Sequence, residues 1–288
     1  MKRKNIVVTG ATGFIGGELV TFLKKQTNVS LKTFDKKKHS LQNISSLVSL
    51  IKGADIVYHL AGVTESGADN IFEVNLQGTV NIARAIRLQK KICDLLFAST
   101  LSVYKPPKKN QEVSEAFPIS PSTNYGISKY LAEEALKVFS DGTNMRSTIL
   151  RISNPYGPTM QPFKHSAIAT FIALAKKNMP ITLHGNGEQT RDFIYIDDVV
   201  SGLWKAASHT RKAPILTLNL ATGKETTLNH AIKLIEKHSG QLLTKKHIKR
   251  TGGPVSFWNI NTEKSRDVLG WNPTISIEQG IKKTWEAL

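Results

Sequence analysis

One short glycine-rich stretch constrains the fold of this chain more than any other feature. Residues 9 to 16 read Thr-Gly-Ala-Thr-Gly-Phe-Ile-Gly, directly after the apolar run at 6 to 8 and before a helical segment. A strand, a glycine turn and a helix can hold a dinucleotide pyrophosphate, because free backbone N–H groups and the helix dipole face its negative charge. Gly10 permits a tight turn, Gly13 a close approach of the phosphates, and Gly16 close packing of the helix on the strand.

The next strand supplies a second feature of a dinucleotide site. It is expected at residues 29 to 34 and is followed by Asp35. A carboxylate at this place can accept hydrogen bonds from the adenosine ribose and repels a 2′-phosphate, so NAD is favoured over NADP. Lys36, Lys37 and Lys38 follow at once and could offset that repulsion, so NADP stays open.

Strands and helices alternate along the first half of the chain, which predicts a parallel sheet covered by helices on both faces. We therefore expect an α/β fold of Rossmann type, doubly wound, with a smaller C-terminal substrate-binding cap and the substrate in the cleft between the two parts. The expected boundaries are 1–152 for the dinucleotide-binding domain, with 192–222 returning to it, and 153–288 for the substrate-binding part.

A candidate catalytic group follows the strand expected at 94 to 98. Thr100 lies just beyond its carboxyl end, where ligands bind in such sheets. Tyr125 and Lys129 begin a helix expected to run to residue 139 and, being four apart, share one face of it. A lysine ammonium beside the phenol is expected to lower its pKa, which makes a general base for an alcohol proton. Thr100 can share the hydrogen bond to the reacting oxygen.

Further motifs follow in an order that resembles a known family. The chain resembles the extended short-chain dehydrogenase/reductases, specifically the NAD-dependent nucleotide-sugar epimerase/dehydratase family, over nearly its whole length. Besides the glycine turn and the Tyr125/Lys129 pair, the resemblance is carried by His-Leu-Ala at 59–61, Asn-Leu-Gln-Gly-Thr at 75–79, Arg-Ile-Ser-Asn-Pro-Tyr-Gly-Pro at 151–158, Gly-Asn-Gly-Glu-Gln-Thr-Arg-Asp-Phe at 185–193 and Leu-Gly-Trp-Asn-Pro at 269–273.

The resemblance implies roles for individual residues. Thr100 takes the place of the family's catalytic Ser/Thr, beside Tyr125 and Lys129. The cofactor contacts that it implies come from Gly10, Gly13, Phe14, Ile15, Gly16, Asp35, Ala61, Asn75, Tyr125 and Lys129. It also implies a homodimer through the helices at about 70–89 and 122–139, with Ile82, Ile86, Leu131 and Leu136 on their apolar faces.

For the substrate, the resemblance implies that Asn154 and Arg191 hold the sugar nucleotide and that Arg250 lies near its diphosphate. Arginine suits this task because its donors form a fixed fork. An ion pair of Arg191 with a nearby aspartate, Asp192, Asp197 or Asp198, is the alternative. Gly253 stands where the family often has an acidic residue that contacts the nucleotide, so the identity of the nucleotide stays open.

The residues after Thr100 discriminate between reactions. Dehydratases of the family carry an Asp-Glu pair there and decarboxylating relatives a Glu, whereas this chain has Leu101 and Ser102. We therefore expect a nucleotide-sugar 4-epimerase of the UDP-hexose or UDP-N-acetylhexosamine type, with Tyr125 as the acid/base. The segment after Asp35 is short, as in 4-keto-sugar reductases, so an NAD(P)H-dependent reductase of nucleotide-diphosphate 4-keto-6-deoxy sugars is the alternative. A non-catalytic nucleotide- or RNA-binding protein is a third reading.

Composition limits the remaining possibilities. The chain has 288 residues and a formal net charge of +17, which favours anionic partners, but it lacks the interleaved aromatics of a nucleic-acid platform, so we expect no nucleic acid. Its single cysteine, Cys93, and the absence of a leader or an apolar membrane span predict a cytoplasmic location. No spacing of His, Cys and Asp suggests a metal site. His59, Cys93, Trp258 and Trp271 are expected to be core residues.

Overall fold

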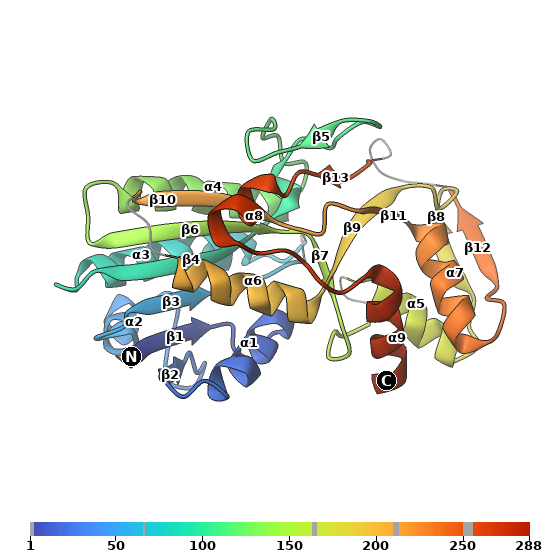
Figure 1. Ribbon diagram of the computed structural model, residues 1–288. Helices are drawn as coiled ribbons and strands as arrows, with labels where there is room; N and C mark the ends of the chain where they lie inside the picture. Colours follow the sequence, from blue (N-terminus) through green and yellow to red (C-terminus); the bar gives the residue numbers. More distant parts are fainter. Residues whose placement is uncertain (1–2, 66, 163–165, 210–212, 250–255) are drawn as a thin grey trace.

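The chain folds around one parallel sheet. The computed structural model describes residues 3–65, 67–162, 166–209, 213–249 and 256–288. Its largest sheet has six parallel strands in the order β10-β6-β4-β3-β1-β2, which confirms the expected doubly wound Rossmann-type fold (Figure 1). These strands are β1 (Lys4–Thr9), β2 (Val29–Thr33), β3 (Ile56–His59), β4 (Cys93–Thr100), β6 (Met145–Ile152) and β10 (Ile215–Leu220).

Helices cover both faces of this sheet, because successive apolar side chains of β1 point to opposite faces and both faces must be buried. Ile6 and Val8 point into one hydrophobic core and Val7, between them, into another. The first core lies under α1 (Phe14–Lys24) and α6 (Ile196–Ser208). The second lies under α2 (Ile44–Ile51), α3 (Gly78–Arg87) and α4 (Asn124–Ser140). Each large apolar side chain buried in this way contributes about 1.5–3 kcal/mol of transfer free energy.

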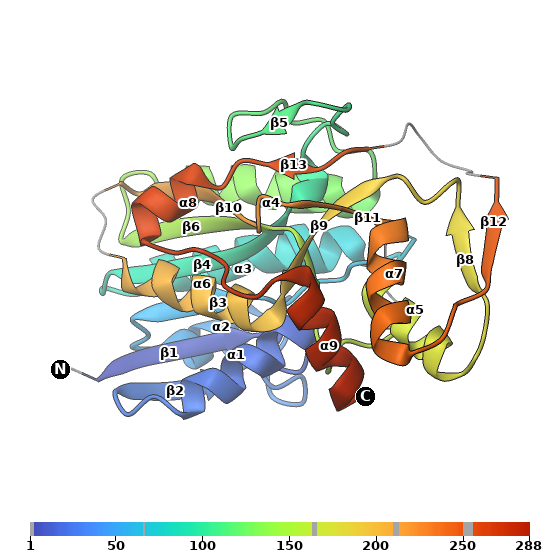
Figure 2. The ribbon, with the colours of Figure 1, turned by 45° about the vertical axis from the view of Figure 1, so that its right-hand side comes forward.

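A smaller group of elements lies beyond the carboxyl ends of the strands, on the right of Figure 1. Strand β9 (Thr190–Tyr195) pairs with β7 (Asn154–Tyr156) and β11 (Glu225–Thr227), while β8 (Ile181–His184) pairs with β12 (Lys245–Ile248), at the right of Figure 2. Three helices pack here: α5 (Ala167–Lys176), α7 (Leu228–Ser239) and α9 (Ile277–Ala287). Their apolar residues join the α1/α6 core, so one core runs from β1 to α9.

Two segments differ from the sequence-based expectation. Of residues 192–222, which we expect to return to the dinucleotide-binding domain, α6 and β10 do so, whereas β9, which ends at Tyr195, belongs to the small sheet. In the other direction, β13 (Asn259–Ile260) pairs with β5 (Glu112–Val113), and α8 (Glu263–Leu269) lies beside β10, so this part of the C-terminal region sits on the large sheet (Figure 1). The proposed division into domains stays a prediction.

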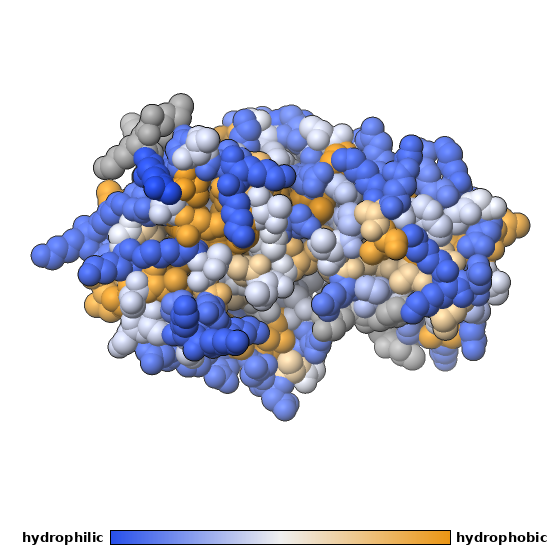
Figure 3. Space-filling model, turned by 90° about the horizontal axis from the view of Figure 1, so that it is seen from below, coloured by the Kyte–Doolittle hydropathy of each residue, from blue (hydrophilic) through white to orange (hydrophobic). Residues whose placement is uncertain are grey.

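Several single residues lie where the sequence predicts. His59 and Cys93 are fully buried and Trp271 is 3% exposed, while Trp258 is only partly buried. No helix among the described residues is long and apolar enough to cross a membrane. Hydrophilic side chains cover much of the face in Figure 3, with smaller apolar patches between them, in keeping with the charge of the chain.

Candidate active site

The glycine turn lies at the switch point of the sheet, where β1 is flanked by β2 on one side and β3 on the other. Gly10 has a φ of +70°, and a Cβ atom there would lie 2.6 Å from the backbone nitrogen of Ala61. A Cβ atom on Gly16 would lie 2.0 Å from the carbonyl oxygen of Gly10. Both positions therefore require glycine, and the turn sits directly against the end of β3.

The residues of this turn fit a dinucleotide. Gly13 precedes the first helical residues of α1, Phe14 and Ile15, and the helix has neither a side-chain cap nor an acidic residue in its first turn. A Cβ atom on Gly13 would meet only the Gly10 carbonyl oxygen, at 3.3 Å, so the outer side of the turn is open. Free backbone N–H groups at an uncapped helix N-terminus are a favourable site for pyrophosphate. Asp35 follows β2, which pairs with β1, and its carboxylate accepts the Lys37 backbone N–H at 2.9 Å.

The three candidate catalytic side chains come together at the end of β4. Helix α4 begins after Thr123, whose hydroxyl accepts the backbone N–H of Gly126 at 3.1 Å. This start places Tyr125 opposite Thr100, whose hydroxyl lies close enough to act on the pKa of the phenol. Lys129, one turn further along, is 4% exposed, and its Nζ lies 4.1 Å from the centroid of the Phe97 ring.

Burial sets the protonation of the pair differently from the sequence-based expectation. It raises the pKa of Tyr125 to about 12, although the hydrogen bond from Thr100 opposes the shift. It also lowers the pKa of Lys129 to about 7, with the charge of Glu133 opposing. The expectation that the pKa of the phenol is lowered is therefore wrong for the protein without its ligands, because desolvation of Tyr125 outweighs the opposing hydrogen bond from Thr100.

Asn75 lies near the candidate site, but its side chain forms hydrogen bonds with other parts of the protein. It is 1% exposed and lies in a π-helical turn, Glu73–Gln77, that precedes α3. Its Oδ1 accepts the backbone N–H of Val63 at 2.8 Å, and its Nδ2 donates to the Val63 carbonyl at 2.8 Å and to the Ser128 hydroxyl at 3.0 Å. Asn75 thus joins the loop after β3, which includes Ala61, to the first turn of α4.

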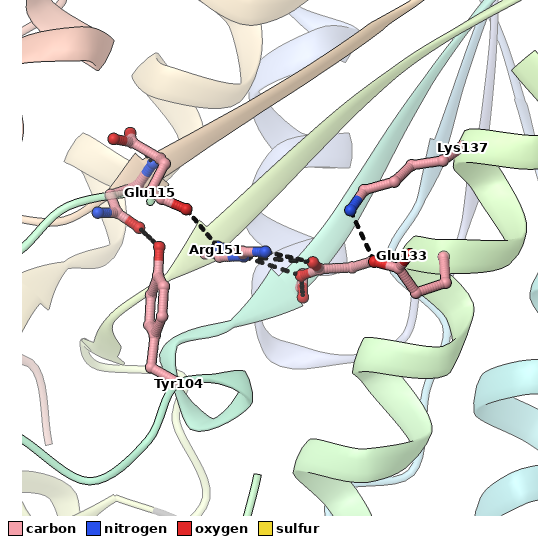
Figure 4. Close-up of polar contacts among 8 residues, drawn as sticks. Tyr104, Glu115, Glu133, Lys137 and Arg151 are labelled. Carbon is pink, nitrogen blue, oxygen red and sulfur yellow. Dashed lines mark hydrogen bonds and ion pairs between the residues drawn. The ribbon is translucent and has the colours of Figure 1, made fainter. Parts of the chain in front are cut away.

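A buried ion pair supports the strand that carries Thr100 (Figure 4). Arg151 of β6 donates from Nη2 to Oε2 of Glu133 on α4 at 2.7 Å, and the two side chains are 4% and 0% exposed. Ser99, the neighbour of Thr100, donates to Oε1 of the same carboxylate. The Arg151 guanidinium also lies 4.7 Å from the centroid of the Tyr104 ring.

Sequence reasoning missed this ion pair, although two signals were present. Glu133 stands four residues after Lys129, which puts both on the face of α4 that meets the sheet. Arg151 interrupts the apolar run of β6, where an unpaired charge would be costly.

The residues expected to hold the substrate lie at the start of the smaller part. Asn154, in β7, donates from Nδ2 to the Asp192 carbonyl at 3.0 Å. Arg191, in β9, donates to the Thr190 carbonyl at 2.7 Å and is partly exposed. The Asp192 carboxylate accepts backbone N–H groups of residues 222–224. Arg250 and Gly253 lie outside the described residues. Among the described residues, no group of His, Cys, Asp and Glu could hold a metal ion.

Comparison with known proteins agrees with this geometry. Residues 6–221 match the model of the NAD dependent epimerase/dehydratase family. A putative UDP-glucose 4-epimerase of Methanocaldococcus jannaschii is 29% identical, over 96% of both chains. UDP-glucuronic acid decarboxylase 1 of Xenopus tropicalis is 27% identical, over 98% of this chain and 71% of its own.

A solved structure extends the comparison to the fold. UDP-glucuronic acid 4-epimerase from Bacillus cereus, in complex with UDP-glucuronic acid and NAD, has a TM-score of 0.87 at 28% identity and covers 98% of both chains. The family match spans most of the chain and includes the glycine turn, Tyr125 and Lys129. The chain therefore belongs to the NAD dependent epimerase/dehydratase family and is an NAD-dependent enzyme.

Proposed function

We propose that this protein is a nucleotide-sugar 4-epimerase acting on a UDP-hexose or a UDP-N-acetylhexosamine. The observation that carries the proposal is the pairing of Tyr125 with Thr100 beside Leu101. Leu101 is 4% exposed and packs with Val103 and Tyr104 in a small core, so the position after Thr100 offers no acid to the site. Loss of water or of CO₂ needs a second titratable group, whereas 4-epimerisation needs one.

The side chains have distinct tasks in this reaction. The chemistry that NAD supplies when bound is to take a hydride from C4 of the sugar and to return it. Tyr125 takes the O4 proton and later gives it back, and Thr100 holds the same oxygen by a hydrogen bond. Lys129, when protonated, favours the phenolate of Tyr125 by its charge. The expected cofactor contacts of Gly10, Gly13, Phe14, Ile15, Gly16, Asp35 and Ala61, and the substrate contacts of Asn154, Arg191 and Arg250, belong to this proposal.

Product analysis tests the proposal directly. Purified protein is incubated without reductant with UDP-glucose, UDP-N-acetylglucosamine, UDP-glucuronic acid and the dTDP-, GDP- and CDP-hexoses, and the products are separated by chromatography. A C4 stereoisomer formed without net NADH supports the proposal, and loss of CO₂ from UDP-glucuronic acid contradicts it. Turnover of 4-keto sugars alone, with NADH or NADPH consumed, makes the enzyme a reductase. RNA binding with a steep salt dependence and no turnover makes it a binding protein.

A pair of tyrosine variants assigns the acid/base. Tyr125→Phe removes the phenol that touches Thr100, and we expect turnover to fall by about 10²-fold or more. Tyr130→Phe is the control, because Tyr130 is a partly buried tyrosine of the same helix that packs on the small core. Equal loss in both variants would show that the helix, and not the phenol of Tyr125, is what matters.

We also propose a homodimer through α3 and α4. Ile82, Ile86 and Leu136 are fully buried within one chain, so they belong to its own core and cannot form the contact. Leu131 and Val138 of α4 are 39% and 75% exposed, so both are available for it. Light scattering should give twice the mass of the chain for the native protein and the single mass for Leu131→Glu/Val138→Glu. A monomeric native protein contradicts the proposal.

The expected cytoplasmic location stays a prediction.

A further inference from the structure

A buried chain of hydrogen bonds crosses the switch point behind the catalytic side chains. The backbone N–H of Ala61 donates to Oγ1 of Thr9 at 3.3 Å, and that oxygen lies 2.7 Å from Nδ1 of His59. Nε2 of His59 lies 3.0 Å from Oγ1 of Thr79, which donates to the carbonyl oxygen of Asn75 at 2.6 Å. Thr9, His59 and Thr79 are each 0% exposed.

The carbonyl oxygen of Asn75 fixes the direction of the hydrogen bonds on the Nε2 side of His59, and a neutral ring then fixes the direction on the Nδ1 side. A carbonyl oxygen only accepts, so the Thr79 hydroxyl donates its proton to the carbonyl oxygen of Asn75 and accepts a hydrogen bond from His59. His59 therefore carries a proton on Nε2. In a neutral ring Nδ1 is then an acceptor, so the Thr9 hydroxyl, which accepts the Ala61 N–H, donates its own proton to Nδ1 of His59. The neutral Nε2–H tautomer satisfies every atom, whereas an imidazolium would leave the Thr9 proton without an acceptor in this chain.

Electrostatics agree with a neutral ring. Burial lowers the pKa of His59 to about 3, and the charge of Lys129 acts in the same direction. A protonated His59 would add a second positive charge near the catalytic lysine.

Both ends of the chain reach parts of the candidate active site. At one end Thr9 immediately precedes Gly10, and Ala61 lies against that glycine. At the other end Asn75 holds Ser128, whose hydroxyl donates to the carbonyl oxygen of Tyr125 at 2.9 Å. A Cβ atom added to Gly62 would lie 3.1 Å from Oδ1 of Asn75 and 3.8 Å from Nζ of Lys129, so the loop lies close to both.

We propose that His59 is a positioning residue: held as the neutral Nε2–H tautomer between Thr9 and Thr79, it fixes the glycine turn relative to the first turn of α4. It touches neither the cofactor nor the sugar. It acts by keeping the phenol of Tyr125 in register with the carbon atom from which hydride leaves. The turnover part of the test rests on the proposed function, and the spectroscopic part does not.

Removing one hydroxyl tests the link without removing the histidine. Thr79→Val keeps the shape of the side chain and breaks the chain between His59 and Asn75. We expect kcat to fall about 10- to 100-fold, as a displacement of roughly 1 Å in a catalytic group does, while KM for the sugar changes less than about twofold. Thr79→Ser restores the hydroxyl and should restore kcat to within about threefold of the native value.

A matched control separates this effect from the cost of losing any buried hydroxyl. Thr284 of α9 is also 0% exposed, and its hydroxyl donates to the carbonyl four residues earlier, Gly280, at 2.8 Å. Thr284→Val should lose stability like Thr79→Val but keep the native kcat. Equal kcat values for Thr79→Val and Thr284→Val would overturn the proposal.

Nitrogen NMR of the native protein tests the tautomer independently of any turnover. The His59→Asn variant identifies the His59 signals, which should show a proton on Nε2 and none on Nδ1, unchanged from pH 5.5 to 9. A proton on Nδ1, or a titration near pH 6.5, would overturn the proposal. If the native protein turns over no nucleotide sugar, the proposed function has failed, and the NMR result still decides whether His59 is held as the neutral Nε2–H tautomer.

Discussion

The buried Arg151–Glu133 pair allows a sharp prediction about stability. Arg151→Met removes the three hydrogen bonds that the guanidinium donates to the Glu133 carboxylate, at 3.1, 3.3 and 2.7 Å. The carboxylate stays fully buried and keeps the hydrogen bond from the Ser99 hydroxyl. Leaving one charge of such a pair buried costs about 3–5 kcal/mol. At about 2–4 °C of Tm for each kcal/mol, the variant should melt roughly 6–20 °C below the native protein.

Two further variants make this prediction refutable. Glu133→Leu/Arg151→Met removes both charges, and it should recover most of the lost Tm, because the main cost is the unpaired charge and not the missing contact. Lys237→Met breaks the exposed Lys237–Glu278 pair, whose atoms are just as close, at 2.6 Å, but whose side chains are 65% and 46% exposed. Water screens that pair, so we expect no measurable shift. Thermal melts at neutral pH that give Arg151→Met and Lys237→Met the same Tm would refute the reasoning.

Two more predictions concern α4. The pKa of Lys129 is about 7 in the folded protein, lowered by burial with Glu133 opposing, and about 10.4 in an unfolded chain, so the native protein gains stability as the pH rises between these values. Lys129→Met should therefore be more stable than the native protein at pH 6, with a gain that shrinks toward pH 10 in denaturant titrations; a constant gain contradicts this. Gly126→Ala puts a Cβ atom 2.4 Å from the Ser102 carbonyl oxygen and should lower kcat about 10-fold or more by shifting Tyr125, whereas Gly17→Ala meets nothing closer than 3.7 Å. Equal kcat values in the two glycine variants would contradict the second prediction.

The fold and the location of the site could be predicted because their signals are local. A glycine turn after an apolar strand, and a tyrosine and a lysine four residues apart, each define their own geometry within a few residues. Gly10 shows the strength of such a signal, since its positive φ and its contact with Ala61 exclude any side chain.

What could not be predicted depends on contacts between distant segments. The pKa of Tyr125 was misjudged because burial is set by the whole fold, while spacing along the helix shows only its nearest neighbours. The Asn75 side chain forms hydrogen bonds with Val63 and with Ser128 of α4, which lie 12 and 53 residues away in sequence, so its spacing from nearby residues does not reveal them. The return of α8 to β10 depends on Ser265, whose hydroxyl donates to the Asn219 carbonyl.

The chain passes between the large sheet and the smaller part several times within the described residues. It leaves the large sheet after Ile152, returns at Ile196 and leaves again after Leu220. The segment of α8 lies on the large sheet once more, and the chain leaves it after Leu269 to reach α9. A single covalent linker would let the two parts swing freely, but several parallel connections over one continuous core restrict them to small displacements. We therefore expect one cooperative melting transition for the entire chain, and ligand exchange that depends on local movement of loops and not on a wide opening of the two parts.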